Sequence, residues 1–316
     1  SAIFDRQTLI DHANPEYGPL SNQLIMTDAR NEGRTPLIRR FAQQSFGTMN
    51  FANHGSYCGQ SCRVGAGMAL GNVAGMPHGK PDWTHAEFGL FIGAAPAQSG
   101  NPFQRQGREL AEARSRPTNP FKYVVVSPIL PTSSSLASGS GNRWLAIKPA
   151  TDLAFVMALL RWMLENERFD HQMLSQPGPA AMTATGEASW CNATHLMIND
   201  PNHPRYGTFL QAGDMGWPIQ ETLAGEAAPN VFVVQRQDGS LAPHDTTLVS
   251  AELFVERHIS APGLGSEPVL VCSALSKLRE ESQRMSLKEY SAECGIPVHE
   301  IQALAKEFTS HGKRAV

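Results

Sequence analysis

Two apolar runs separated by a helical pattern are the clearest feature of the chain. Residues 87–93 read EFGLFIG and residues 122–127 read KYVVVS. Both are apolar at successive positions, as strands buried on both faces are. Residues 103–115 between them, FQRQGRELAEARS, have the spacing of a helix. This order predicts a βαβ unit with parallel strands covered by helices.

The pattern continues after a hydroxyl-rich loop at 131–142. A short apolar run at 144–147 predicts a third strand, and residues 153–167 predict an apolar helix with Thr151 or Asp152 as its N-cap. The fold class predicted is therefore α/β, with a Rossmann-like parallel sheet, flanking helices and irregular insertions.

The second half of the chain is less periodic. Residues 176–230 are rich in Gly, Pro and Asn and predict long irregular connections. Residues 231–235 predict a strand that enters a hairpin turn at Asp238-Gly239. Helices are expected at 268–282 and 298–310, with Gly295 as a helix terminator.

Composition and charge exclude several classes of function. A net charge of -3 over 316 residues supplies no basic field, so a nucleic-acid partner is not expected. Apolar stretches such as 88–97 are well short of the roughly 20 residues that cross a bilayer. The first residues lack a basic segment followed by an apolar one, so no signal peptide is expected in this chain. Five cysteines do not make a disulfide framework.

The loop at 93–102, GAAPAQSGNP, joins the first strand to the helix. Backbone N–H groups at such a place bind nucleotide diphosphates. The loop lacks the G-x-G-x-x-G spacing, so a purely structural loop is an equal alternative. The second strand ends in Ser127-Pro128, where an ordinary dinucleotide fold offers an acid to the ribose. Residues 133–135, three serines, either bind phosphate oxygens or form a linker.

The segment HGSYCGQSC at 54–62 is the most reactive-looking stretch. On a helix, His54, Cys58 and Cys62 would share one face, whereas Gly55 and Gly59 favour a bend that exposes Cys58. Arg63 nearby would favour the Cys58 thiolate. The hypotheses for Cys58 are a nucleophile, a metal ligand or an inert thiol.

Several separated motifs, in order, carry a resemblance to a known family. They are NHGSYC at 53–58, DWTHAEFGLFIG at 82–93, Pro96 with SGNP at 99–102, and KPATD at 148–152. Together they resemble the catalytic subunits of the molybdopterin oxidoreductase (DMSO reductase) family. The similarity runs over nearly the whole chain and is greatest to the branch that reduces tetrathionate.

The resemblance implies a molybdenum ion held by two molybdopterin guanine dinucleotides, with Cys58 as its protein ligand. His54 and Arg63 would assist catalysis by steadying an anionic substrate. The implied cofactor-binding residues are Gly93, Ala94, Pro96, Ser99, Gly100, Asn101, Ser127, Pro128, Ser133, Ser134, Ser135, Lys148, Thr151 and Asp152. Many family members have Asp at the position of Ser127 and Gly at that of Ala150.

The resemblance also implies an organisation. Residues 1–81 would carry the molybdenum-ligand loop, 82–175 the dinucleotide-binding βαβ region, and 176–316 an irregular connection and a C-terminal α/β part of the same region. No Cys precedes Cys58, so the family's iron–sulfur cluster would belong to the full-length subunit rather than to this chain. The chain is thus predicted to be the central part of a longer subunit, inactive when alone.

The implied reaction is the reductive cleavage of tetrathionate, a small sulfur oxyanion, to two thiosulfates in anaerobic respiration. Electrons would come from two partners, an iron–sulfur subunit plus a membrane anchor subunit, which implies a periplasmic location or the outer face of the cytoplasmic membrane. Arsenate, selenate and polysulfide are alternative substrates. A non-catalytic nucleotide-binding α/β module is the alternative outside the family.

Overall fold

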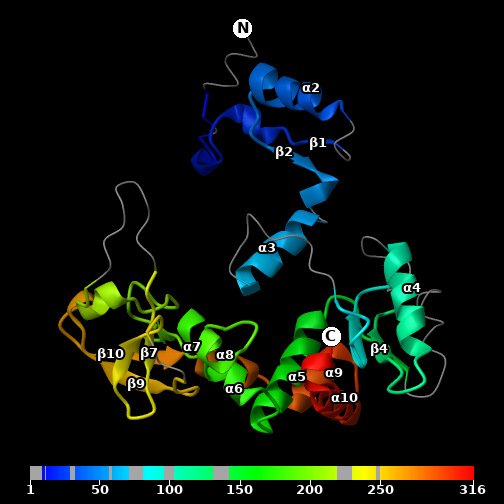
Figure 1. Ribbon diagram of the computed structural model, residues 1–316. Coiled ribbons are helices and arrows are strands. Elements are labelled where there is room, and N and C mark those ends of the chain that lie inside the picture. Colours follow the sequence, from blue (N-terminus) through cyan, green and yellow to red (C-terminus); the bar gives the residue numbers. More distant parts are fainter. Residues whose placement is uncertain are drawn as a thin grey trace. The chain divides into compact units, whose positions relative to one another are not determined.

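The computed structural model describes residues 9–10, 12–28, 33–56, 59–70, 81–95, 103–130, 142–218, 230–246 and 250–316. The chain divides into two compact units, Ser1–Pro81 and Asp82–Val316 (Figure 1). No helix among the described residues combines the length and the hydropathy that a membrane crossing requires. The boundary expected at residue 175 stays a prediction.

The first unit contains two short parallel strands, β1 (Met26–Asp28) and β2 (Phe51–Asn53). They are joined through α2 (Thr35–Arg39), which continues directly into the π-helix η3 (Arg40–Phe46). The unit also contains η1 (Pro15–Tyr17), η2 (Leu20–Gln23), η4 (His54–Ser56) and α3 (Gly59–Leu70). Among its described residues, Ala42 is the single buried apolar side chain, so this unit has little core of its own.

The second unit is built on the predicted parallel sheet. The strands β3 (Phe88–Ile92), β4 (Lys122–Val126) and β5 (Arg143–Leu145) lie in the order β3-β4-β5, all parallel. The helix α4 (Phe103–Arg114) connects the first two. The βαβ unit and the α/β fold class are therefore confirmed.

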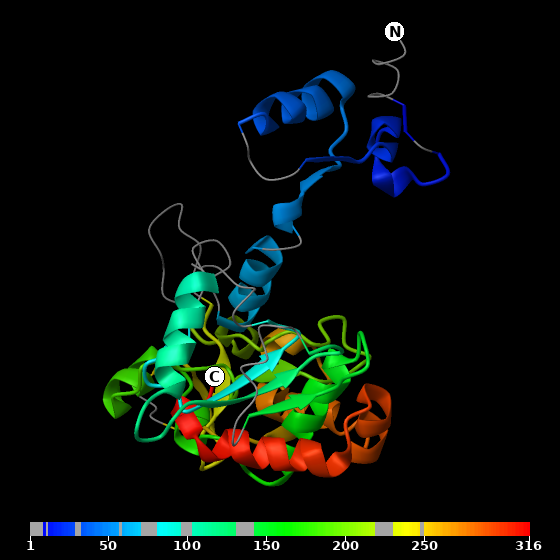
Figure 2. The same cartoon turned by 90° about the vertical axis from the view of Figure 1, so that its right-hand side faces the viewer.

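Helices cover both faces of this sheet (Figure 2). Phe88, Val124, Val126 and Leu145 pack against α5 (Asp152–Glu165), α9 (Leu287–Cys294) and α10 (Val298–Ser310). On the other face, Phe91, Tyr123 and Val125 pack against Leu110 and Ala113 of α4. Residues far apart in the sequence therefore share one core, and that core fixes the strand ends described below.

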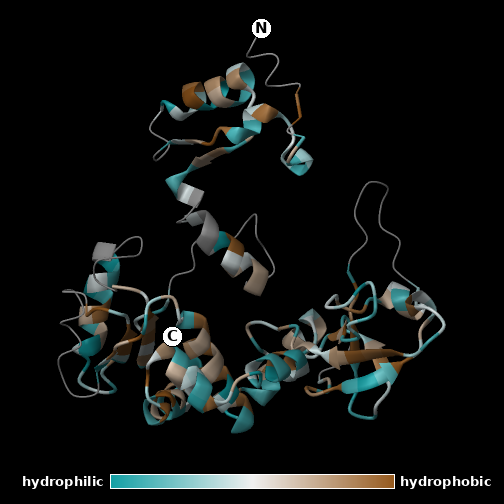
Figure 3. Ribbon diagram, turned by 180° about the vertical axis from the view of Figure 1, so that it is seen from behind, coloured by the Kyte–Doolittle hydropathy of each residue, from teal (hydrophilic) through white to brown (hydrophobic). Residues whose placement is uncertain are grey.

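A second, antiparallel sheet was not predicted. Its strands are β6 (Leu196–Ile198), β10 (Val269–Ser273) and β9 (Glu256–Ile259), with β10 in the centre. The apolar β10 is part of the brown region of Figure 3. Beside this sheet, β7 (Val233–Gln235) and β8 (Leu241–Pro243) form the expected hairpin, with Gly239 at φ +85°.

Two expectations for the second half were partly wrong. The helix expected at 268–282 begins only at α8 (Ala274–Ser282), because the run VLVCS at 269–273 pairs on both sides as β10. The segment 176–230 is not wholly irregular, since it contains α7 (Pro179–Thr185), β6 and η6 (Ala212–Met215). These elements are too short to show a period in the sequence.

The remaining elements complete the unit. The helix expected at 298–310 is α10, and Gly295 ends α9 at φ +79°, as expected. The short helices α6 (His171–Ser175), η7 (Pro262–Leu264) and η8 (Gly312–Arg314) join the larger elements.

Candidate functional site

The carboxyl ends of β3, β4 and β5 lie together at one edge of the parallel sheet. Gly93 follows β3 at φ +61°, and its N–H donates to the carbonyl of Val126 over 2.9 Å. The N–H of Ser127, which follows β4, donates to the carbonyl of Leu145 over 3.2 Å. The three strand ends are therefore hydrogen-bonded to one another, which fixes their relative positions.

Residues 315–316 pair with β3 on the side away from β4. The N–H of Val316 donates to the carbonyl of Phe88 over 2.9 Å, and the N–H of Leu90 donates to the carbonyl of Val316 over 2.8 Å. Ala315 forms an isolated parallel bridge with Phe88. Ligands of open α/β sheets bind outside the carboxyl ends of the strands. Gly93 and Ala94 lie at that end of β3.

The N-terminus of α5 adds backbone donors near this edge. Thr151 is the N-cap residue by position, as expected, but its side chain does not cap the helix. Its hydroxyl instead donates to the carbonyl of Lys148 over 2.7 Å. The first N–H groups of a helix carry partial positive charge and favour an anion when no side chain accepts from them.

Lys148 is engaged within the fold. Its Nζ donates to the carbonyl of Ala292 at the end of α9 over 2.6 Å, and its backbone N–H donates to the carbonyl of Cys294 over 2.9 Å. The aliphatic chain of Lys148 packs against Gly295, and a Cβ added at Gly295 would lie 3.1 Å from Lys148 Cγ. Lys148 thus holds the segment before α5 against α9, and two of its three ammonium protons remain for a ligand.

Ala150 has a left-handed backbone conformation, with φ +63°. In the folded chain, this conformation costs a residue with a Cβ about 1–2 kcal/mol. In the unfolded chain, Ala has fewer conformations than Gly, which favours folding of the Ala chain by roughly 0.4–1 kcal/mol. The first effect is the larger one. We expect Ala150→Gly to raise the free energy of unfolding by up to about 1 kcal/mol. Urea unfolding followed by circular dichroism measures it.

The matched control is Ala303→Gly, at an exposed position inside α10. There the same change is expected to lower the free energy of unfolding by about 1 kcal/mol, because helical Gly costs backbone entropy. A loss of stability in both variants would contradict the strain assigned to Ala150.

Trp144 is a residue of this edge that the sequence predicts only as part of a strand. Its indole Nε1 donates to the carbonyl of Ser127 over 2.9 Å, while the residue stays 41% exposed. Trp144 therefore fixes the Ser127-Pro128 end of β4 and leaves an aromatic face in solvent. The sequence feature that points to this role is a tryptophan in a short strand at the edge of the sheet.

The structure tests only some of the predicted site residues. Cys58, Pro96, Ser99, Gly100, Asn101, Ser133, Ser134 and Ser135 lie outside the described residues. Gly93, Ala94, Ser127, Pro128, Lys148, Thr151 and Asp152 lie at or beside the sheet edge just described. Their predicted roles toward a cofactor stay predictions.

His54 and Arg63 belong to the first unit. His54 is exposed in η4, and Arg63 is exposed on α3, so both side chains are accessible to an anion. The two residues do not share one helix, since η4 ends at Ser56 and α3 begins at Gly59. The alternative in which His54, Cys58 and Cys62 share one helix face involves Cys58, which lies outside the described residues, and it stays a prediction.

The chemistry of the sheet edge is compatible with a nucleotide. Among the described residues, no atom lies within 4 Å of where a Cβ on Gly93 would be. Pro128 and Asp152 are exposed there, and Ser127 is 7% exposed. Small residues let backbone N–H groups approach phosphates, and an exposed carboxylate accepts from the donors of guanine or ribose.

The three described cysteines outside this region are structural. Cys272 is 1% exposed on β10, and burial raises the pKa of its thiol to about 11. Cys294 is fully buried at the end of α9, and Cys191 is half-buried with a pKa raised by the same cause. The thiols of Cys272 and Cys191, which burial keeps neutral, are poor metal ligands.

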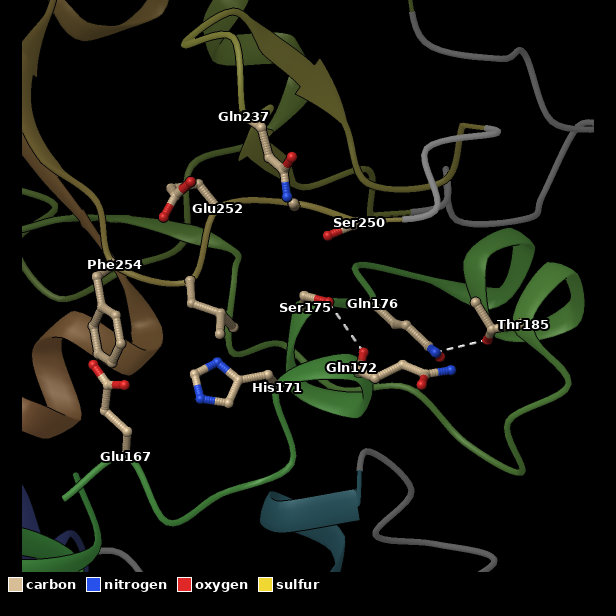
Figure 4. A pocket seen from close by; sticks show the side chains of 12 residues that line it. Glu167, His171, Gln172, Ser175, Gln176, Thr185, Gln237, Ser250, Glu252 and Phe254 are labelled. Carbon is tan, nitrogen blue, oxygen red and sulfur yellow. Dashed lines mark hydrogen bonds between the residues drawn. The ribbon is translucent and has the colours of Figure 1, made fainter.

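A separate cavity of about 660 Å³ lies beside α6 (Figure 4). Its wall carries two carboxylates, Glu167 and Glu252, and the imidazole of His171. Gln176 Nε2 donates to Thr185 Oγ1 over 2.6 Å at its side. The lining residues include no Lys or Arg, so this cavity does not suit an anion.

Two histidines are buried close together beneath the hairpin. The rings of His195 and His244 lie 4.9 Å apart, and His195 Nε2 bonds to the carbonyl of Pro177 over 2.8 Å. Burial lowers the pKa of His195 to about 4 and also lowers that of His244. Both rings are therefore neutral at pH 7 and act as packing groups.

The parallel sheet and its covering helices place the second unit among α/β proteins. No family model matches the chain. The chain is 44% identical over 314 residues to a tetrathionate reductase subunit of Salmonella typhimurium, a match that covers 99% of this chain and 29% of that protein. The resemblance expected from the sequence is thereby confirmed, and the relatives carry the names of oxidoreductase subunits.

A second relative is a selenate reductase subunit of Mesobacillus selenatarsenatis, 28% identical over 97% of this chain and 28% of that protein. The chain thus spans less than a third of the length of these relatives. Among solved structures, acetylene hydratase from Pelobacter acetylenicus covers 96% of this chain and 26% of its own, at 13% identity and a TM-score of 0.45. That similarity is too low to add to the assignment.

Proposed function

We propose that the chain is part of the catalytic subunit of a molybdenum reductase that converts tetrathionate to two thiosulfates. The observation that carries the proposal is the 44% identity, along 99% of the chain, to a subunit of a tetrathionate reductase. The reaction adds two electrons to the central S–S bond of tetrathionate, which breaks to leave one electron pair on each thiosulfate.

The cofactor proposed is molybdenum bis(molybdopterin guanine dinucleotide), with Cys58 as the protein ligand of the metal. Molybdenum supplies two-electron transfer, and a soft thiolate is a suitable ligand for it. The N-terminus of α5, the Gly93 turn and the Asp152 carboxylate would hold the diphosphate and guanosine of one dinucleotide. His54 and Arg63 would hold negative charge of the substrate.

The partners proposed are an iron–sulfur electron-transfer subunit plus a membrane anchor subunit. An iron–sulfur cluster in the full-length subunit would carry electrons toward the cofactor. The location proposed is the periplasm or the outer face of the cytoplasmic membrane. These proposals follow from the family resemblance and from the relatives, which are named as subunits of larger enzymes.

The test combines metal analysis with a reduction assay on the purified full-length subunit. We expect about one molybdenum and two guanine nucleotides in each subunit, together with reduction of tetrathionate by a chemically reduced dye. Arsenate, selenate and polysulfide are the comparison substrates. Absence of molybdenum and guanine would instead support a non-catalytic nucleotide-binding module.

Selenate is the second candidate substrate, because a selenate reductase subunit is 28% identical along nearly the whole chain. Reduction of selenate without reduction of tetrathionate would overturn the substrate assignment and keep the cofactor assignment.

A further inference from the structure

A polar cavity in the first unit lies outside the site described above. It has a volume of about 460 Å³ and is lined by residues of α2, η3 and the end of β2. Its lining residues are Thr35, Pro36, Arg39, Arg40, Gln43, Gln44 and Asn53. Two guanidinium groups and three side-chain amides thus surround one small volume, and both of these group types donate hydrogen bonds.

The spacing of these residues explains why they meet. Arg39 and Gln43 are four residues apart, and so are Arg40 and Gln44, so each pair lies on one side of the helix. Asn53 comes from β2, which the parallel pairing with β1 brings beside this helix. The cavity therefore depends on the fold and could not be read from the sequence alone.

The local backbone is unusual at the same place. Residues 40–46 form a π-helix, which closes with the N–H of Gly47 donating to the carbonyl of Ala42 over 2.9 Å. Gly47 ends the segment at φ +92°. Pi-helical turns are rare and are frequently found at functional sites, which is a second indication that this helix does more than pack.

The charge of the cavity is positive. Neither Arg39 nor Arg40 forms an ion pair with any carboxylate among the described residues. One carboxylate is bonded to the cavity wall: Asp28 Oδ2 accepts from the hydroxyl of Thr35 over 2.5 Å, while its Oδ1 is buried without a partner among the described residues. Arg39 also lies over the ring of Phe51, with 5.3 Å between its Cζ and the ring centroid. Arg39 and Arg40 are both exposed, and no ring contact of Arg40 is seen among the described residues.

We propose that the cavity lined by Arg39, Arg40, Gln43, Gln44 and Asn53 is a binding subsite for a tetrahedral oxyanion. The planar fork of Arg matches two oxygens of such a group, and amide N–H groups satisfy the others. On the proposed function, which this inference extends, the oxyanion is a sulfonate end of the sulfur oxyanion substrate. The diphosphate of a nucleotide carries the same chemistry, and the test separates the two sources.

The subsite lies close along the chain to the proposed metal ligand. Asn53 precedes Cys58 by five residues, and a chain of five residues spans at most about 18 Å when fully extended. This sets an upper limit on the distance between Asn53, which lines the cavity, and the residue at which the substrate would react. The subsite would raise the local concentration of a doubly charged substrate without touching the bond that breaks.

The first test is steady-state kinetics of the full-length subunit with Arg40→Gln. We expect KM for tetrathionate to rise about 10- to 100-fold, as for loss of a charge-assisted hydrogen bond, with kcat within about twofold of the wild type. Arg34→Gln is the matched control, because it removes the same charge from an exposed position just before α2. Equal KM values in the two variants would overturn the subsite.

The second test is calorimetric titration of the 316-residue chain with thiosulfate, tetrathionate, sulfate, phosphate and pyrophosphate. We expect saturable binding of thiosulfate and tetrathionate that is lost in Arg40→Gln and kept in Arg34→Gln. Preference for pyrophosphate would assign the cavity to a nucleotide and overturn the substrate assignment. A third outcome separates the two proposals. If thiosulfate binds and depends on Arg40 but the full-length subunit does not reduce tetrathionate, the proposed function is refuted and the anion subsite is kept.

Discussion

Replacing Cys58 by Ala in the full-length subunit is expected to abolish tetrathionate reduction. On the proposed function, Cys58, which stands between Tyr57 and Gly59, would be the protein ligand of the metal. Alanine offers no donor there, and losing even one preorganised group from an active site costs about 10²- to 10³-fold in turnover. We therefore expect a loss of at least about a hundredfold, measured with a reduced dye as electron donor.

Cys62→Ala is the matched variant, because Cys62 lies four residues further along and has no role in the proposed site. It is expected to keep a substantial part of the activity. Molybdenum content, measured on both variants, shows whether the metal is lost or only altered. An equal loss of activity in both variants would contradict ligation by a single cysteine.

The stability of the chain is expected to fall as the pH falls from about 6.5 to about 4. His195 is 1% exposed, and its surroundings lower its pKa from 6.5 to about 4 through burial. In the unfolded chain the same imidazole takes up a proton near pH 6.5, so the unfolded state binds more protons in this interval. The resulting loss in the free energy of unfolding is on the order of 3 kcal/mol.

The direction of this effect follows from the lowered pKa. The stabilisation is complete above pH 6.5 and is lost progressively below it, because a neutral buried His must become charged when the chain unfolds. His244, the titratable neighbour of His195, has a pKa lowered by burial and adds a loss of the same sign. Urea unfolding at pH 7.5, 5.5 and 4.5 measures the sum.

Two measurements assign the effect to His195. The imidazole resonances of His195 should show no protonation at pH 5.5 in a nuclear magnetic resonance titration of the folded chain. His195→Gln should reduce the slope of stability against pH, whereas His258→Gln, on the exposed part of β9, should leave it unchanged. Protonation of His195 near pH 6.5 in the folded chain would refute this explanation.

Local patterns predict the parallel sheet well. The runs EFGLFIG and KYVVVS became β3 and β4, and the helix between them is α4. Each of these signals lies within a few residues and does not depend on distant contacts. The sequence therefore indicates the sheet edge, including Gly93, Ser127 and the start of α5.

Long-range pairing explains what the sequence does not predict. The run VLVCS is equally apolar in a helix and in a strand, and it becomes β10 because β6 and β9 pair with it from both sides. The cavity at Arg39 and Arg40 likewise needs the pairing of β1 with β2 to bring Asn53 beside the helix. A local sequence pattern predicts neither of these strand pairings.

The pairing of residues 314–316 with β3 has a consequence for folding during synthesis. Arg314 and Glu87 interact across a separation of 227 residues, and α9 and α10 complete the core that begins with β3. The ribosome therefore exposes the apolar faces of β3, β4 and α5 long before their final neighbours exist. Until α9 and α10 have been synthesised, these apolar faces are open to contact with other chains, and exposed apolar surface of this kind favours aggregation.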